Sequence, residues 1–442
     1  MEIRRAAFTG LVNAAQKRDA APVITLPWRA PEAAFSSLSD RPCSLLLHGG
    51  GQVSRIYAFP EKTISRDVER GDFPGIAAEL RDALAGGGQW AGLFSYEFAS
   101  AFEHVPRAAP SQWRDINLGL YPAWAVFDGG AQTVEVFGQK NAAQHLADAF
   151  GELKACPAPS PQTRASWTER WSAQRYQASC SHIIEHIAAG DIYQANLSQG
   201  FDVALAQGDT PYAAFLRLLG QSPAPYGGYF CLDENQAVLT NSPELFLKLK
   251  GGIAQSAPIK GTRPRGTTTK SDTAQVDALL ASEKDRAENL MIVDLVRHDL
   301  SRVCVPGSVE VPELCAPHSY ANVHHLVSTV RGEIRETVDA FDLLAAAFPP
   351  GSITGTPKIR AMEIIAEQEG EARGPYCGAM GWIGAGGQSM ELNVMIRTAA
   401  LTRSGASWHA AIRSGGAITI GSDPVSEFEE TLAKASALRA AF

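Results

Sequence analysis

The sequence predicts an α+β fold, and three observations carry that prediction. Segments with a strand pattern and segments with a helix pattern follow one another irregularly, without the regular strand–helix alternation of an α/β fold. Short strand-like runs separated by glycine clusters fill the first third of the chain. The 442 residues are 45% hydrophobic and 19% charged, which is typical of a globular protein and excludes a disordered or collagen-like chain.

A proline-rich stretch divides the chain. Residues 156–163 hold three prolines in eight positions, a composition that suits an exposed connection. We therefore expect an N-terminal region at 1–155, a connection at 156–166 and a second region at 167–442.

Strand and helix patterns can be assigned on both sides of the connection. Before it, the runs at 43–50, 92–98 and 121–128 have the composition of strands. After it, residues 172–190 predict a helix, because apolar residues recur every three or four positions and Gly190 stands where a helix ends. Further helices are expected at 210–220, around 281–300 and at 424–442, and further strands at 191–205, 236–250, 377–384, 390–401 and 407–421.

Charge and cysteine content exclude several classes of function. The net charge of −8, from 47 acidic and 39 basic residues, argues against nucleic acid or an anionic membrane surface as a partner. The seven cysteines form no CxxC pair, which favours free thiols over zinc. The longest apolar runs, such as 343–348, are too short to span a bilayer. We expect a soluble, cytoplasmic protein.

A glycine-rich loop at 349–365 is a candidate anion site. A Gly-Ser-x-Thr-Gly sequence runs into a predicted helix, with Pro357 at about the first helical position. The free N–H groups and the dipole of a helix start favour an anion. The phosphate-loop pattern GxxxxGK[ST] is absent, so a plain glycine-rich turn is the alternative.

Two pairs of carboxylates stand three residues apart on predicted helices. Asp285 and Glu288 share one helix face, and Glu427 and Glu430 share another. Two acidic faces that converged would suit Mg²⁺, whereas two separate faces would be ordinary solvated surface.

Two further residues are candidates for catalysis. Lys260, between Pro-Ile and Gly-Thr, would be a nucleophile if its pKa were depressed, although a lone lysine is usually a surface charge. Glu244 follows a proline near a strand, where a partly buried carboxyl group would act as a general acid or would pair with an arginine.

Together these segments resemble the chorismate-utilising enzymes, in particular the large subunits of aminodeoxychorismate synthase and anthranilate synthase. The N-terminal part matches more loosely, through 42–50 and 92–106. His48 stands there in place of the usual serine, in the segment with which relatives hold tryptophan. The strong matches, in family order, are GDIYQANLS (190–198), NSPELFL (241–247), PIKGTRPRG (258–266), DLVRHDLSRV (294–303), VHHLVSTVRGEI (323–334), PPGSITGTPKIRA (349–361), GPYCGAMGW (374–382), LNVMIRTA (392–399) and GSDPVSEFEETLAKA (421–435).

The resemblance implies a fold and a binding site. The fold would be two β-sheets packed face to face and covered by helices. Glu288, Glu427 and Glu430 would bind Mg²⁺, with Asp285 beside them, and the metal would hold the ring carboxylate of chorismate. The substrate-binding positions implied by the resemblance are Tyr376 and Arg397 for the enolpyruvyl carboxylate, His325 facing the ring, the backbone of Gly351, Ser352, Thr354 and Gly355 at the helix start, and Gly415 and Gly416 in close backbone approach.

Two positions indicate the type of reaction. Relatives that add water carry a lysine base where this chain has Gln194, and a neutral amide cannot take a proton from water. Anthranilate synthases usually carry a small residue where this chain has Lys260. The resemblance therefore implies Mg²⁺-dependent amination of chorismate at C4 to 4-amino-4-deoxychorismate. Lys260 would attack C2, Glu244 would protonate the departing C4 hydroxyl, and ammonia would then displace the lysine.

A partner is implied as well. The chain has no G-x-C-x-G nucleophile elbow, so ammonia would come from a separate glutamine amidotransferase subunit or from solution. Two alternatives stay open: an anthranilate synthase component I and a non-catalytic chorismate-binding regulatory protein.

Overall fold

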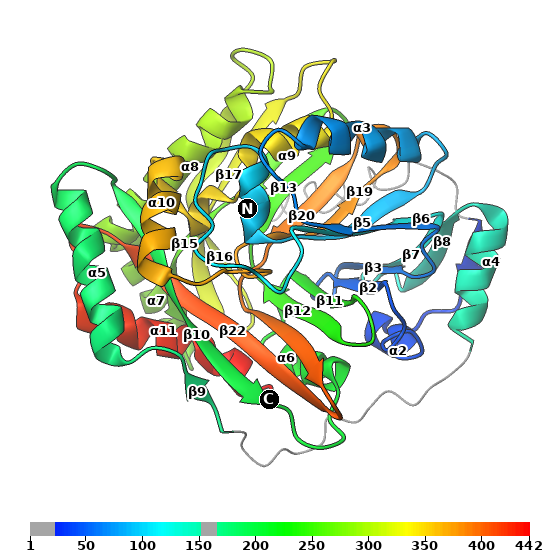
Figure 1. Cartoon of the computed structure of the whole chain (residues 1–442), viewed down its shortest axis with the longest axis horizontal. Helices are drawn as coiled ribbons and strands as arrows, with labels where there is room; N and C mark the ends of the chain where they lie inside the picture. Colours follow the sequence, from blue (N-terminus) through cyan, green and yellow to red (C-terminus); the bar gives the residue numbers. More distant parts are fainter. Residues whose placement is uncertain (1–22, 152–165) are drawn as a thin grey trace.

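The structure, a computed structural model, describes residues 23–151 and 166–442. All but the last residue of the expected connection at 156–166 lies outside these ranges. Two antiparallel β-sheets pack face to face and are covered by helices (Figure 1), so the predicted α+β class is confirmed. None of the described helices is long and apolar enough to cross a membrane.

The larger sheet has twelve strands among the described residues. In spatial order they are β1 (Ile24–Leu26), β8 (Thr133–Gly138), β7 (Ala123–Asp128), β3 (Val53–Tyr57), β2 (Ser44–His48), β11 (Tyr226–Cys231), β12 (Gln236–Ser242), β21 (Thr398–Ser404), β22 (Ser407–Ile418), β10 (Gln194–Ala204) and β18 (Gly355–Thr356), with β9 (Thr168–Glu169) paired to β10.

The smaller sheet has ten strands within the same ranges. Their order is β15 (Ile259–Pro264), β17 (Val323–Glu333), β14 (Ile253–Ala257), β13 (Leu245–Lys250), β20 (Met390–Val394), β19 (Ala379–Ile383), β5 (Gln89–Phe94), β6 (Ile116–Tyr121) and β4 (Lys62–Arg66), with β16 (Glu310–Ser319) paired to β17. Strands from before and after the connection are neighbours in both sheets, because β2 pairs with β11 and β5 pairs with β19.

Helices cover the outer faces of the sheets and the ends of the longest strands (Figure 1). Against the larger sheet lie α2 (Pro31–Phe35), α4 (Lys140–Ala149) and α6 (Pro211–Gln221). Against the smaller sheet lie α3 (Phe73–Leu84), α7 (Thr269–Ala281), α8 (Glu283–Ser301) and α9 (Ala340–Ala347). Beside β10 and β22 lie α5 (Ala173–Ala188), α10 (Lys358–Glu369) and α11 (Pro424–Arg439).

Apolar side chains from both sheets meet in the space between them. Leu45 and Phe230 from the larger sheet and Leu93 and Met380 from the smaller one belong to one buried cluster, and each is at most 2% exposed. Burying a side chain of this size contributes about 1.5–3 kcal/mol, so this layer holds the two sheets together.

The chain crosses from one sheet to the other at two neighbouring points. The expectation of a single strand at 236–250 is wrong, because β12 lies in the larger sheet and β13 in the smaller one, with Glu244 between them. The predicted strand at 390–401 divides in the same way, with Arg397 at the crossing. The N-S-P-E sequence at 241–244 interrupts the first segment at its crossing, whereas Arg397 alone marks the crossing in the second.

Backbone hydrogen bonds hold the two crossings side by side. The amide of Val394 donates to the carbonyl of Glu244, and the amide of Asn241 donates to the carbonyl of Arg397, each at 3.1 Å. Arg397 has a φ of +52°, a left-handed conformation that costs a non-glycine residue about 1–3 kcal/mol. The fold therefore brings Glu244 and Arg397 close to each other, where the chain passes from one sheet to the other.

Candidate active site

A cavity of about 440 Å³ opens beside the two crossings, between strands of both sheets and helices α8 and α11. Its walls include residues from segments far apart in the sequence. The predicted residues that line it are Glu244, Lys260, Asp285, Glu288, His325, Ser352, Tyr376, Arg397, Gly415, Glu427 and Glu430.

Other predicted residues lie behind the wall of this cavity and do not line it. These residues are Gln194, Gly351, Thr354, Gly355 and Gly416. The hydroxyl of Thr354 donates to the carbonyl of Pro350 at 3.1 Å, and a Cβ atom at Gly355 would lie 2.2 Å from the carbonyl oxygen of Gln194. Thr354 and Gly355 therefore shape the loop that presents Ser352, whereas Gly416 lies on β22 beside Glu427 and Glu430. Helix α10 follows this loop and begins at Lys358, with Pro357 at its N-cap.

Lys260 reaches into the cavity from β15. Its Nζ atom donates a hydrogen bond of 3.1 Å to the carbonyl oxygen of Ser352. Burial lowers the pKa of Lys260, and the negative charges of Glu288 and Glu244 oppose that shift. The amine is therefore easier to deprotonate than an exposed lysine.

Glu244 lies at the sheet crossing and is 4% exposed. Burial raises its pKa to about 7, while a hydrogen bond with the side chain of Ser352 and the charge of Lys260 act in the opposite direction. Ser352 thus contacts both groups, through its carbonyl oxygen and through its hydroxyl. The site holds an acid and an amine whose pKa values are shifted toward each other, the arrangement expected of a proton-transfer pair.

Arg397 and His325 form the polar part of another wall. Arg397 makes no ion pair or side-chain hydrogen bond with residues 23–151 or 166–442, and burial lowers its pKa. His325 is 3% exposed, its Nδ1 atom lies 2.9 Å from Oγ1 of Thr262, and its buried Nε2 atom has no partner among the described residues. Burial and the nearby Arg397 lower the pKa of His325 to about 4, so the imidazole is neutral at pH 7. An arginine without a protein partner, beside a free imidazole nitrogen, can bind a carboxylate.

The four predicted metal carboxylates lie at the edge of the cavity, on α8 and α11. Asp285 is paired with Arg263 at 3.1 Å. Burial raises the pKa of Glu288. Glu427 and Glu430 point toward Gly416, where an added Cβ atom would lie 3.2 Å from Oε2 of Glu427 and 3.7 Å from Oε1 of Glu430.

These carboxylates have lysine partners. Nζ of Lys284 lies 4.0 Å from Glu288 and 3.7 Å from Glu427, and Nζ of Lys434 lies 2.6 Å from Glu430. Within the described ranges, no group of three or more His, Cys, Asp or Glu side chains is arranged to hold a metal ion. The donor set nevertheless fits Mg²⁺, because its ligands are hard carboxylate oxygens and an ammonium already lies between two of them.

The sequence analysis did not single out several residues of this cavity. The two lysines carry the clearest signal, since Lys284 directly precedes Asp285 and Lys434 follows Glu430 by one helical turn. Asn196 and Arg413 have no comparable local pattern, because strands β10 and β22 bring them to the cavity.

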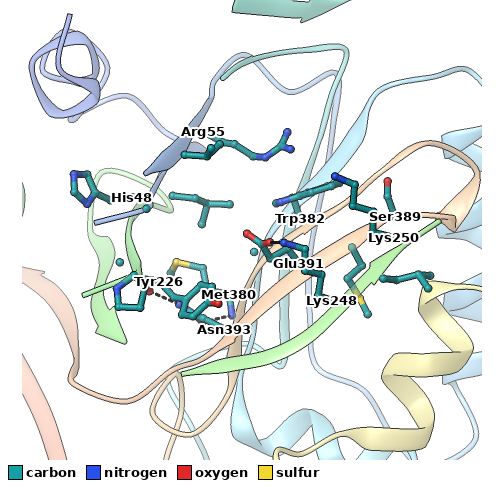
Figure 2. A pocket seen from close by; sticks show the side chains of 18 residues that line it. His48, Arg55, Tyr226, Lys248, Lys250, Met380, Trp382, Ser389, Glu391 and Asn393 are labelled. Atoms are coloured by element: carbon teal, nitrogen blue, oxygen red, sulfur yellow. Dashed lines mark hydrogen bonds and ion pairs between the residues drawn. The ribbon is translucent and has the colours of Figure 1, made fainter. Parts of the chain in front are cut away.

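A separate, smaller cavity of about 90 Å³ lies between the sheets (Figure 2). In its wall, Lys248 pairs with Glu391 at 2.7 Å, and the guanidinium of Arg55 lies 4.2 Å from the ring centroid of Trp382. His48 lies on the side of the cavity opposite Lys248 and Glu391. None of the predicted catalytic, metal or substrate-binding residues lines this cavity.

Comparison with known proteins identifies the family of this chain. Residues 33–440 match the family model described as chorismate binding enzyme. Aminodeoxychorismate synthase component 1 of Klebsiella aerogenes is 37% identical, over 93% of this chain and 97% of the relative. Anthranilate synthase component 1 of Streptomyces coelicolor is 34% identical, over 94% of this chain and 82% of the relative.

Solved structures share the fold. The crystal structure of anthranilate synthase component I from Streptococcus pneumoniae has a TM-score of 0.75 at 25% identity, and the comparison covers 88% of this chain and 92% of that one. The menaquinone-specific isochorismate synthase MenF of Escherichia coli has a TM-score of 0.75 at 17% identity, with 99% of both chains covered, and this likeness concerns the fold alone. The family model matches nearly the whole chain, and a relative that is 37% identical covers 93% of it. This chain therefore belongs to the chorismate-binding enzymes.

Proposed function

We propose that this chain aminates chorismate at C4 and releases 4-amino-4-deoxychorismate, as a soluble, cytoplasmic component of p-aminobenzoate and folate synthesis. Four relatives at 34–37% identity are named aminodeoxychorismate synthase component 1, which supports both the reaction and a partner component. We take that partner to be a glutamine amidotransferase that supplies ammonia. The observation that carries the proposal is the placement of Lys260 beside the buried Glu244 in one cavity.

The first step uses the proton shared by this pair. When the pair holds one proton and the proton is on Glu244, Lys260 is a free amine. Its lone pair forms a bond to C2 of chorismate, the two ring double bonds shift toward C4, and the C4–O bond breaks. Glu244 gives its proton to the departing hydroxyl, which leaves as water. The lysine thereby divides one difficult substitution into two allylic ones.

The second step restores the enzyme. Ammonia forms a bond to C4, the double bonds shift back, and the bond between C2 and the Lys260 nitrogen breaks. Lys260 leaves as the neutral amine, and the one proton lost by the new C4 ammonium group returns to Glu244, so the pair again holds one proton. The sum is chorismate plus ammonia giving aminodeoxychorismate plus water.

The remaining groups recognise the two carboxylates of the substrate. We assign the enolpyruvyl carboxylate to Arg397 and Tyr376, with His325 facing the ring, because Arg397 has no ion-pair partner in the described chain. We assign the ring carboxylate to Mg²⁺ held by Glu288, Glu427 and Glu430. When bound, Mg²⁺ would supply the positive charge that these acidic side chains cannot.

Anthranilate synthesis is the second candidate, favoured by the relative of that name at 34% identity. Both reactions use chorismate, and they differ in the position that is aminated. A lysine adduct at C2 is required only when ammonia enters at C4.

Product analysis decides between the two candidates. The purified chain is incubated with chorismate, MgCl₂ and ammonium chloride, which replaces the amidotransferase, and the products are separated by liquid chromatography and mass spectrometry. Aminodeoxychorismate as the main product supports the proposal, whereas anthranilate with an equal amount of pyruvate refutes it. The matched control is Lys270→Ala, at an exposed position of α7.

A further inference from the structure

Two lysines at the edge of the cavity lie among the acidic side chains that we assign to Mg²⁺. Lys284, on α8, stands between Glu288 of its own helix and Glu427 of α11, so its ammonium connects the two helices. Lys434, on α11, contacts Glu430 and also donates to the carbonyl oxygen of Gly415 at 3.2 Å. Two ammonium groups therefore compensate two of the three negative charges without a metal ion.

Lys284 and its two carboxylate partners differ in freedom of movement. The side chain of Lys284 is 55% exposed, whereas those of Glu288 and Glu427 are 13% and 5% exposed. Glu427 is also held in place, because Ser422 donates a hydrogen bond of 2.7 Å to its Oε1 atom. An ammonium on a flexible, half-exposed stem can turn into water, whereas the buried carboxylates remain.

We propose that Lys284 is an exchangeable counter-ion: its ammonium compensates Glu288 and Glu427 in the metal-free enzyme, and a divalent cation must displace it to bind. The inference deepens the proposed function, because it rests on the metal site assigned there. It also explains why the described residues contain no group of three or more His, Cys, Asp or Glu side chains arranged to hold a metal ion.

The electrostatics favour this exchange. At 3.7 and 4.0 Å the contacts of Lys284 are longer than a charge-assisted hydrogen bond, which spans about 2.7–2.9 Å. A Mg²⁺ ion has twice the charge and lies about 2.1 Å from its ligands, so it attracts each carboxylate about three to four times as strongly at equal dielectric constant.

Mg²⁺ titration without chorismate tests the inference. Isothermal titration calorimetry with MgCl₂ compares the wild-type chain with Lys284→Met, which keeps the length of the side chain and removes its charge. Lys284→Met should bind Mg²⁺ at least about tenfold more tightly, because no ammonium has to be displaced. Its metal-free form should melt at a lower temperature than the wild-type chain, since two carboxylates then face each other uncompensated. Lys270→Met, on exposed α7, should change neither quantity.

Other results would overturn the proposal. An equal or weaker Mg²⁺ affinity of Lys284→Met would show that the ammonium does not compete with the metal, and so would a wild-type chain that does not bind Mg²⁺. If Lys284→Met does not fold, Lys284→Gln offers the same comparison. These titrations use no substrate, so their result is independent of which product is formed from chorismate.

Discussion

Nζ of Lys260 donates a 3.1 Å hydrogen bond to the carbonyl oxygen of Ser352, and the hydroxyl of the same serine bonds to the carboxyl group of Glu244. One residue of the glycine-rich loop therefore positions both members of the proton-transfer pair. The loop was expected to bind an anion through its backbone, and its structure indicates a second task, which is to fix the nucleophile relative to the acid.

Replacing Lys260 by Ala should abolish a covalent chorismate adduct. The wild-type chain, incubated with chorismate and MgCl₂ without ammonium and then quenched in acid, should gain the mass of chorismate less one water. Intact-protein mass spectrometry measures this gain. Lys270→Ala should retain it. An adduct on Lys260→Ala would place the nucleophile elsewhere.

The pH dependence of kcat/KM should be bell-shaped. The active pair carries one proton, so activity rises with pH as the doubly protonated pair loses a proton near pH 7, the pKa of Glu244. It falls again at the pKa of Lys260, which burial places below that of an exposed lysine. Glu244→Gln should lose the basic limb, because no carboxylic acid remains to be deprotonated, and about 10²–10⁴-fold of the rate. Its rate should rise only as Lys260 loses its proton. A fall in rate at high pH that persists in Glu244→Gln would assign the general acid to another group.

Ser352→Ala should move the acidic limb to higher pH. The hydrogen bond from Ser352 lowers the pKa of Glu244, so its removal lets burial raise that pKa further. The contact with Lys260 uses the backbone carbonyl of Ser352 and survives the substitution. A pH profile of kcat/KM for the variant measures the shift, and a limb at unchanged pH would argue against the contact between Ser352 and Glu244.

Arg397→Gln should weaken substrate binding without loss of stability. A charge-assisted contact to a carboxylate is worth about 1.5–3 kcal/mol, so KM should rise roughly 10- to 150-fold. Tm should not fall, because Arg397 has no ion pair to lose among the described residues. Arg413→Gln is the contrasting variant, since Arg413 lines the same cavity and pairs with the buried Glu369 at 3.0 Å, and its Tm should fall. A marked loss of stability in Arg397→Gln would contradict the assignment.

Glu288→Gln should weaken Mg²⁺-dependent binding of chorismate by about 1–3 kcal/mol, because a charged ligand is lost. Chorismate titrations with and without MgCl₂ measure this difference. Asp294→Asn, an exposed position on the same helix, is the control. Titrations of Glu288→Gln that match the wild-type chain would refute the metal assignment.

Local patterns predicted most of the elements that surround the site. The helices expected at 172–190 and 424–442 correspond to α5 and α11, because their apolar spacing and end signals lie within each segment. The spacing of Asp285 and Glu288 placed them on one helix face. Nothing in that spacing says that α8 and α11 face each other, and only the resemblance to a family supplied this pairing.

The missed features are those that depend on tertiary contacts. Glu244 and Arg397 lie at sheet crossings, and the strand assignment overlooked both, although the N-S-P-E sequence at 241–244 interrupts the apolar pattern at the first. The partners of Lys284 lie on two helices about 140 residues apart in the sequence, so its ion pair with Glu427 has no local signature.

The product of the ammonia-driven reaction tests the central claim most directly. With chorismate, MgCl₂ and ammonium chloride, the chain should release 4-amino-4-deoxychorismate, and Lys260→Ala should release none. Anthranilate and pyruvate as the main products, or undiminished formation of aminodeoxychorismate by Lys260→Ala, would contradict the account.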